Sequence, residues 1–256
     1  MDAIILAGAT NNGALRASSD SPFEASIPIE GRPLLDYVVR PLTAVENMER
    51  IVVVGPEEGL NPDLRASIWR VVPFGASMVE NLRRGIKALS PKGKVLVLTA
   101  DIPLITTEAI EDFLARCRER EADVFYPLVG REPIEDRFPG VERTYAALRE
   151  GTFTGGNIIL FSPEVIERCL ATIEEALALR KKPLRMAGLL GLWYLFKLMV
   201  GRLSIAEVEE RIEKKLHFKG VAVITPYAEI GIDVDKPSDL ELVQRVLAAQ
   251  ARVEPA

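Results

Sequence analysis

Short runs of apolar, β-branched residues alternate along the chain with longer segments in which apolar residues recur at the spacing of one helix face. Several runs are apolar at every position, which is typical of strands buried on both faces of a parallel sheet. The predicted strands are residues 3–7, 51–54, 68–72, 95–99, 124–126, 157–161 and 221–225.

The segments between these runs begin with the signals that helices commonly carry. A proline, or a Ser or Thr followed closely by Glu, marks several of the starts. The predicted helices are residues 34–45, 78–89, 106–119, a helix beginning at 162–164, and 236–250. Strands that alternate with helices predict an α/β fold, in which a mostly parallel sheet lies between two helical layers.

The strand and helix alternation stops between about residues 170 and 218, which we interpret as a helical insertion in a single domain of residues 1–256. It combines an apolar stretch, 186–200, with a charged helix, 204–216, that begins with a capping box of Ser204 and Glu207. The apolar helix could pack on the sheet, form a dimer surface or touch a membrane surface; we favour packing or a homodimer. Its aromatic residues are then core or interface residues: Trp193, Tyr194 and Phe196.

Composition excludes several classes of function. The chain has 256 residues, with 32 Lys and Arg against 37 Asp and Glu, for a formal charge of −5. This balance argues against a dedicated nucleic-acid binder. The longest apolar stretch falls short of the roughly 20 residues that a membrane-spanning helix needs. The first residues lack the basic segment of a signal peptide, so we expect a cytoplasmic protein.

Histidine and cysteine are too scarce to build a zinc site from several such ligands. His217, the one histidine, lies at the predicted end of the charged helix, where a cation interacts favourably with the helix dipole. Cys117 and Cys169 fall in predicted helices without C-x-x-C spacing, so we expect both to be reduced packing residues.

Candidate ligand-binding residues follow the predicted strands, because open parallel sheets bind ligands beyond the carboxyl ends of their strands. The first such loop, residues 7–16, is rich in small residues whose backbone N–H groups can approach a phosphate, although it is neither a Walker A loop nor a dinucleotide fingerprint. Another such loop, residues 152–157, contains Gly155 and Gly156, which permit close backbone approach. It also contains Asn157, which can bind a polar substrate. The alternative for this segment is a plain turn.

Two further loops carry carboxylates. Asp101 follows the apolar strand 95–99, and either caps the next turn or binds Mg²⁺. Asp233 and Asp235 leave a short strand just before the last helix, and alternate strand residues face the same side. Both can therefore reach the strand-end cleft, although Asp235 or Ser238 could instead cap the helix.

Taken in order, these segments resemble the MobA-like nucleotidyltransferases, which include the molybdenum-cofactor guanylyl- and cytidylyltransferases and the methylerythritol phosphate cytidylyltransferases. The resemblance covers most of the chain outside the insertion. The residues that carry it are ILAG at 5–8, IPIEGRPLL at 27–35, GASMVENL at 75–82, TADIPL at 99–104 and DVDKPSDL at 233–240.

The resemblance implies a glycosyltransferase-A-like, Rossmann-like fold. It also implies that Asp101 and Asp233, with Asp235 as second choice, bind Mg²⁺ against a nucleoside triphosphate, while an acceptor phosphate or hydroxyl attacks the α-phosphorus and pyrophosphate leaves. The expected nucleotide-binding residues are Leu6, Ala7, Gly8, Ala9, Gly75, Ser77 and Ala100. This chemistry needs charge neutralisation and positioning more than a protein nucleophile, which agrees with a chain that has one histidine.

The chain departs from the family pattern at two positions. Ala9 replaces a glycine of the first loop, and Glu24 stands where the family has a phosphate-binding Lys. Arg16 is the remaining basic residue of that loop and the candidate phosphate clamp. Because a carboxylate repels a triphosphate, a nucleotide-binding regulatory protein is one alternative, and a glycosyltransferase that uses a nucleotide-sugar is another. The sequence specifies neither the NTP nor the small-molecule acceptor.

Overall fold

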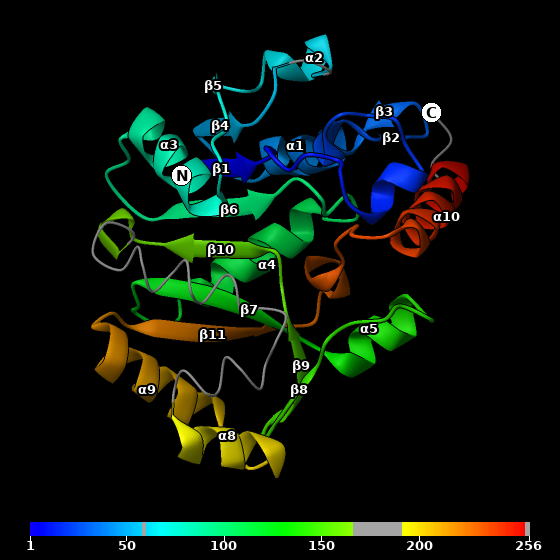
Figure 1. Ribbon diagram of the computed structural model, residues 1–256. Coiled ribbons are helices and arrows are strands. Elements are labelled where there is room, and N and C mark those ends of the chain that lie inside the picture. Colours follow the sequence, from blue (N-terminus) through cyan, green and yellow to red (C-terminus); the bar gives the residue numbers. More distant parts are fainter. Residues whose placement is uncertain (58–59, 166–190, 254–256) are drawn as a thin grey trace. The chain divides into compact units, whose positions relative to one another are not determined.

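A computed structural model of the chain describes residues 1–57, 60–165 and 191–253 (Figure 1). The chain forms two compact units. Unit 1 combines Met1–Glu111 with Ile232–Ala256, and unit 2 is Asp112–Gly231. Unit 1 is therefore built from two segments that are far apart in the sequence.

The sheet of unit 1 is entirely parallel. Its strands lie in the order β5-β4-β1-β6, with β1 paired to β4 and β6, and β4 paired to β5. Their bounds are Asp2–Leu6 for β1, Arg50–Val54 for β4, Arg70–Val72 for β5 and Val95–Thr99 for β6. All four were predicted from apolar runs, and the central residues of β1 and β4 are fully or almost fully buried.

Helices lie on both faces of this sheet. The chain moves one way across the sheet from β1 to β4 to β5 and back from β5 to β6, and right-handed crossovers place the connecting helices of the two directions on opposite faces. The helices of unit 1 are α1 (Leu34–Ala44), α2 (Pro62–Arg65), α3 (Met78–Leu89) and α10 (Pro237–Val253). The chain passes from unit 1 to unit 2 within α4 (Thr107–Cys117). The α/β fold with a mostly parallel sheet is thus confirmed.

Five short elements of unit 1 were not predicted: the helix α2, two strands and two 3₁₀ turns. The strands β2 (Pro28–Ile29) and β3 (Arg32–Pro33) form a hairpin, and Glu30 and Gly31 at its turn have positive φ angles of 48° and 75°. Such a turn matches the twist of the paired strands, and glycine adopts it without strain. Two 3₁₀ turns, η1 (Ala14–Ala17) and η2 (Glu24–Ser26), precede the hairpin.

Unit 2 is organised around β7 (Val124–Gly130). β11 (Gly220–Thr225) pairs with it in parallel, whereas β9 (Gly151–Gly155) and β10 (Ile158–Phe161) run antiparallel to it. β9 also pairs with β8 (Ala146–Leu148). The unit includes α5 (Arg131–Arg137) and η3 (Ala228–Gly231). The expectation of a loop over 152–157 was wrong, because residues 152–155 belong to β9 and form a ladder with β7 and β8.

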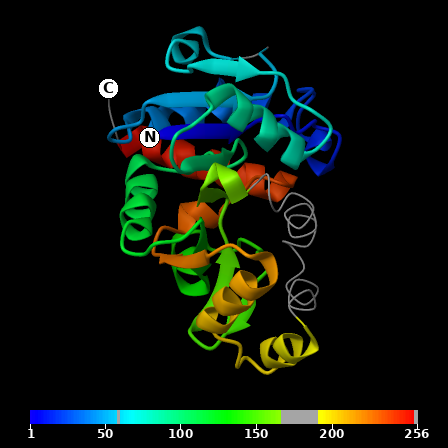
Figure 2. The ribbon, with the colours of Figure 1, turned by 90° about the vertical axis from the view of Figure 1, so that its left-hand side faces the viewer.

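Two helices of the predicted insertion are described, and they lie side by side (Figure 2). α8 spans Leu192–Met199 and α9 spans Ile205–Leu216. The capping box of Ser204 and Glu207 is confirmed, and His217 ends α9 in a left-handed conformation with φ 57°. Residues 170–190 of the insertion lie outside the described residues, and they include the start of the apolar stretch. Cys169 also lies outside the described residues.

Leu198 and Leu203 form a small core that packs against residues of β8 and α9. The opposite side of α8 is exposed: its large apolar residues there are Leu192, Trp193, Phe196 and Met199. Within the described part of the chain, no helix has both the length and the apolar character needed to cross a membrane.

Candidate functional site

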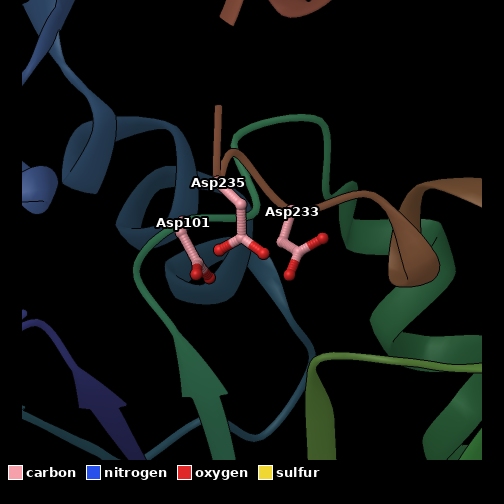
Figure 3. A group of neighbouring side chains, drawn as sticks. All are labelled: Asp101, Asp233 and Asp235. Carbon is pink, nitrogen blue, oxygen red and sulfur yellow. The ribbon is translucent and has the colours of Figure 1, made fainter. Parts of the chain in front are cut away.

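Three carboxylates converge in unit 1. Asp101 follows β6, and Asp233 and Asp235 follow η3 in the segment that returns to unit 1. One ligand oxygen from each residue lies within 4.8 Å of those from the other two, and the three side chains point toward a common region in Figure 3. Asp233 is buried, Asp101 is half-buried and Asp235 is exposed, so the group connects the protein interior to solvent.

Backbone hydrogen bonds fix the two segments that carry these carboxylates. The Val234 N–H donates to the Asp101 carbonyl oxygen at 2.9 Å, and the Ala100 N–H donates to the Leu6 carbonyl oxygen at 3.1 Å. Residues 100 and 101 are thus held between the first strand and the returning segment. These contacts bring Asp101, Asp233 and Asp235 together, as predicted. The short strand expected before Asp233 is absent, because residues 228–231 form the 3₁₀ helix η3 and residues 232–235 are irregular.

Asp239 holds the backbone beside the carboxylates. Its Oδ2 accepts hydrogen bonds from the N–H groups of Asp235 at 3.2 Å and Lys236 at 3.3 Å, and its side chain is buried. A carboxylate in the first turn of α10 also interacts favourably with the helix dipole. Asp239 therefore provides the helix-start contacts that the sequence interpretation considered for Asp235 or Ser238.

The first loop is packed against two other segments. The Ala7 N–H donates to the Val54 carbonyl oxygen at 2.8 Å, and the Glu24 N–H donates to the Ala9 carbonyl oxygen at 3.0 Å. A Cβ atom on Gly8 would lie 2.5 Å from the Cβ atom of Phe74, which is closer than real atoms approach. The loop therefore needs glycine at position 8, and Glu24 lies directly beside it, as the departure from the family pattern implied.

Two of the predicted nucleotide-binding residues, Gly75 and Ser77, lie at the start of α3. The Ser77 Oγ accepts a hydrogen bond from the Glu80 N–H at 3.1 Å, so Ser77 is the N-cap of the helix. The Gly75 N–H donates to the Asn81 Oδ1 at 2.5 Å. A hydrogen bond from the Ala76 N–H, followed by the bond from Arg84, lowers the pKa of the Glu80 carboxyl.

Arg16, the candidate phosphate clamp, lies in η1 with contacts inside its own loop. Its guanidinium donates to the Asp20 carbonyl oxygen at 2.7 Å and forms an ion pair with the Asp20 carboxylate at 3.3 Å. Both side chains are largely exposed, so this pair is weak and can exchange for a phosphate.

The residues assigned to the acceptor lie in unit 2, at the junction of β9 and β10. The Gly156 N–H donates to the Pro127 carbonyl oxygen at 3.1 Å, and the Asn157 N–H donates to the Ile230 carbonyl oxygen at 3.0 Å. A side chain on Gly155 would collide with the Tyr126 hydroxyl. The two glycines are thus required by close packing within unit 2.

The sequence profile described as "MobA-like NTP transferase domain" matches residues 3–185, which is more than half of the chain. This chain belongs to that family. The match includes Gly8, Gly75 and Asp101, and it ends before the segment that supplies Asp233 and Asp235.

A solved structure from Thermus thermophilus, described as a hypothetical transferase, is 40% identical, with a TM-score of 0.81 over 93% of this chain and 98% of that one. Two more distant structures share the fold. Molybdopterin-guanine dinucleotide biosynthesis protein A from Archaeoglobus fulgidus is 11% identical, with a TM-score of 0.53 over 97% of this chain and 100% of that one. The 4-diphosphocytidyl-2C-methyl-D-erythritol synthase from Anaerococcus prevotii is 14% identical, with a TM-score of 0.56 over 96% and 97%. Among curated proteins, none matches this chain.

Sequence reasoning did not assign a role to two residues that organise this family member's site, Asp239 and Asn81. Both are polar residues in helices, and the structure buries both. Asn81 lies among the apolar positions of α3, between Val79 and Leu82, so its place in the helix pattern was an available signal. Asp239 had a weaker signal, because an acidic residue in a first turn is common.

Proposed function

We propose that the protein is a Mg²⁺-dependent nucleotidyltransferase, which transfers a nucleoside monophosphate from an NTP to a small phosphorylated or hydroxyl acceptor and releases pyrophosphate. The convergence of Asp101, Asp233 and Asp235 carries this proposal. Asp101 adjoins Ala100, whose N–H bonds to the Leu6 carbonyl oxygen at the start of the first loop. A cation bound by the carboxylates would offset their repulsion of a triphosphate.

The donor set fits Mg²⁺. All three side chains offer hard oxygen ligands, which magnesium prefers, and neither histidine nor cysteine is among them. Asp101 and Asp233, with Asp235 as second choice, would hold Mg²⁺, and the ion would neutralise charge on the triphosphate and on the leaving pyrophosphate. Val234 and Asp239 keep the ligands in place through the backbone contacts described above.

The remaining residues act by positioning. We assign the nucleotide to Leu6, Ala7, Gly8, Ala9, Gly75, Ser77 and Ala100, whose backbones are held by strand ends and by α3. Holding the α-phosphorus in line with the acceptor oxygen and the leaving oxygen accelerates transfer without a protein nucleophile. Arg16 would exchange its contact with Asp20 for a phosphate oxygen. We assign the acceptor to Gly155, Gly156 and Asn157.

We place the reaction in the cytoplasm, where nucleoside triphosphates are made and where Cys117 and Cys169 would stay reduced. The similarity to the Thermus thermophilus structure, described as a hypothetical transferase, supports group transfer over simple binding. The position of Glu24 beside Ala9 favours a second candidate, a nucleotide-binding protein that does not transfer, because its carboxylate opposes the triphosphate.

Release of pyrophosphate distinguishes these functions. The protein is incubated with each NTP, Mg²⁺ and a pool of small phosphorylated alcohols, and Asp101→Asn serves as the matched inactive variant. We expect pyrophosphate from one NTP, and none after EDTA is added or from the variant. Stabilisation by an NTP without pyrophosphate would establish the binding protein instead. A nucleoside diphosphate released from a nucleotide-sugar would establish a glycosyltransferase.

A further inference from the structure

The first loop is part of a longer loop whose two ends are in contact. The Asn11 N–H donates to the Pro22 carbonyl oxygen at 2.9 Å, and Thr10 and Phe23 form an antiparallel bridge. The residues between these contacts form a closed loop, which carries Arg16 in η1. The whole loop belongs to unit 1.

The Asn11 side chain holds the returning part of this loop from the inside. It is buried, with 4% of its surface exposed, and its Nδ2 donates to the carbonyl oxygens of Ser19 at 2.8 Å and Ser21 at 3.0 Å. Because both partners are acceptors, the amide nitrogen and not the amide oxygen must face them. One side chain therefore fixes two peptide groups of the returning segment.

Arg16 bonds to the carbonyl oxygen that lies between those two in the sequence. Its Nη1 donates to the Asp20 carbonyl oxygen at 2.7 Å, and its Nη2 forms the ion pair with the Asp20 carboxylate at 3.3 Å. Three successive carbonyl oxygens are thus bound, two by a buried asparagine and one by an arginine that is largely exposed. Since planar peptide groups leave few soft torsions between them, Asn11 also restricts how the Asp20 carbonyl group can turn.

The two ends of the Arg16 guanidinium group have different kinds of partner. Nη1 contacts a backbone oxygen in the segment that Asn11 holds. Nη2 contacts a carboxylate that is fully exposed, and an ion pair of this kind contributes little to stability and is screened by salt. A phosphate oxygen can therefore replace the carboxylate at Nη2 while the bond at Nη1 is kept.

The remaining polar atom of Asn11 indicates that this side chain does more than stabilise the fold. Its Oδ1 is buried and has no hydrogen-bond partner among the described residues. A buried acceptor without a donor is unfavourable, which offsets part of the free energy that the two donated bonds contribute. The arrangement is thus an inefficient source of stability, although it orients the backbone on both sides of Asp20.

We infer that Asn11 is a positioning residue for the phosphate clamp, because it holds the backbone of residues 19–21, to which the Arg16 guanidinium is anchored, and so leaves Nη2 for the triphosphate. The inference rests on the proposed function, which gives Arg16 a phosphate contact. Asp20 then has two opposed effects. Its carbonyl oxygen anchors the guanidinium, and its carboxylate competes with the phosphate.

Substitutions at these two positions should change NTP binding in opposite directions. The NTP that wild type binds most tightly is titrated calorimetrically with Mg²⁺. We expect Asn11→Ala to bind it about fivefold to tenfold more weakly, because Arg16 loses its fixed position. Asp20→Ala keeps the carbonyl oxygen and removes the competing carboxylate, so it should bind the NTP about twofold to threefold more tightly at low salt.

The same substitutions in an Arg16→Ala background separate positioning from loss of structure. Arg16→Ala should itself weaken NTP binding, and neither Asn11→Ala nor Asp20→Ala should then change it by more than about twofold. A merely structural role of Asn11 predicts the same loss with and without Arg16. Ser18→Ala removes an exposed hydroxyl from the same loop, and this control should bind the NTP like wild type.

A second variant guards against loss of folding. Asn11→Ser keeps a hydroxyl donor in the loop, and it takes the place of Asn11→Ala if thermal melting shows that Asn11→Ala is unfolded. Its loss of NTP affinity should depend on Arg16 in the same way.

Unchanged NTP binding in Asn11→Ala or Arg16→Ala, weaker binding in Asp20→Ala, or a loss in Asn11→Ala that persists without Arg16 would each overturn the inference while leaving nucleotidyl transfer intact. A wild-type protein that binds no NTP with Mg²⁺ would overturn the proposed function, and the inference with it. The two failures are therefore distinguishable in one set of titrations.

Discussion

At the scale of single residues, the carboxylates of the candidate metal site give the most direct test of function. Asp101→Asn and Asp233→Asn each remove a negative charge that Mg²⁺ requires and the core does not. We expect each to weaken Mg²⁺-dependent NTP binding by about 100-fold or more, since even outer-shell changes cost about 10–100-fold in metal affinity. Calorimetric titration measures this, with the exposed Asp63→Asn as control. Unchanged binding in both variants would contradict the metal assignment.

Glu24 tests the departure from the family pattern. Its backbone N–H bonds to the Ala9 carbonyl oxygen, so residue 24 adjoins the first loop, to which we assign the nucleotide. Glu24→Lys should strengthen triphosphate binding by about threefold to tenfold at low salt, and added salt should reduce the gain. Glu24→Gln removes the charge without reversing it, so its affinity for the triphosphate should lie between those of wild type and Glu24→Lys. Weaker binding by Glu24→Lys would show that Glu24 is itself a ligand for metal or substrate.

Asp36 allows a test of how the free energy of unfolding depends on pH. It is buried in α1, its Oδ1 has no hydrogen-bond partner among the described residues, and its Oδ2 accepts from the Asn61 Nδ2 at 3.2 Å. Burial raises its pKa above the usual 3.8, against smaller opposing effects of Asn61, Arg40 and Arg32. A raised folded-state pKa stabilises the fold at low pH, and this contribution is lost as pH rises through that value.

Asp36→Asn keeps the hydrogen bond to Asn61 and does not titrate. The free energy of unfolding of this variant, minus that of wild type, should therefore increase between about pH 4 and pH 7. Urea unfolding at several pH values measures the difference. A difference that is constant over this range, or that decreases, would show that Asp36 ionises in the folded protein without penalty.

At the scale of elements, α8 leaves apolar surface exposed to solvent. Leu192 is 83% exposed, Met199 is 70% exposed, and the rings of Trp193 and Phe196 stack with centroids 5.7 Å apart. Adjacent apolar residues of this size on one helix face commonly mark an interface. We predict a homodimer through the predicted helix 186–200, of which the structure describes the part from residue 191.

Replacing Trp193 and Phe196 together with Ser should convert the dimer to monomer at micromolar concentration, because each buried aromatic contributes roughly 1.5–3 kcal/mol. Light scattering reads the molar mass, and Trp69→Ser, which removes an exposed aromatic residue from unit 1, is the control. A wild-type monomer would contradict the dimer. Binding of that monomer to lipid vesicles would establish an interfacial helix instead.

At the scale of the whole molecule, the sequence predicted the elements whose pattern is local. All four parallel strands of unit 1 are apolar runs, and α3 has the predicted bounds. β9 was missed because the glycines that follow it, Gly155 and Gly156, indicated a turn, although the Thr and Phe residues before them are types enriched in strands. Pairing with β7 and β8 places these residues in a strand.

The candidate site likewise contains residues whose place is predictable from a local pattern and residues whose place depends on contacts with distant segments. Asp101 was predictable because it follows the strand β6, and strand ends are where open parallel sheets bind ligands. Asp233 and Asp235 were also predicted to follow a strand, but they follow the 3₁₀ helix η3, and the backbone contact of Val234 with Asp101 brings them to the site. Asn81 and Asp239 act through backbone groups of other segments, and a sequence pattern does not show which backbone group a helix side chain will meet. The exposed ion pair of Arg16 with Asp20 was likewise not predicted from the sequence.

The construction of unit 1 from two separated segments has a consequence for the order in which the protein is made. During synthesis, the strands of unit 1 and Asp101 leave the ribosome first, and unit 2 follows them. The segment with Asp233 and Asp235 leaves the ribosome after unit 2. At 5–20 residues per second the delay is on the order of ten seconds. A growing chain therefore carries both proposed nucleotide loops and Asp101 but not yet Asp233 and Asp235, so the proposed Mg²⁺ site becomes complete only after unit 2 has been made.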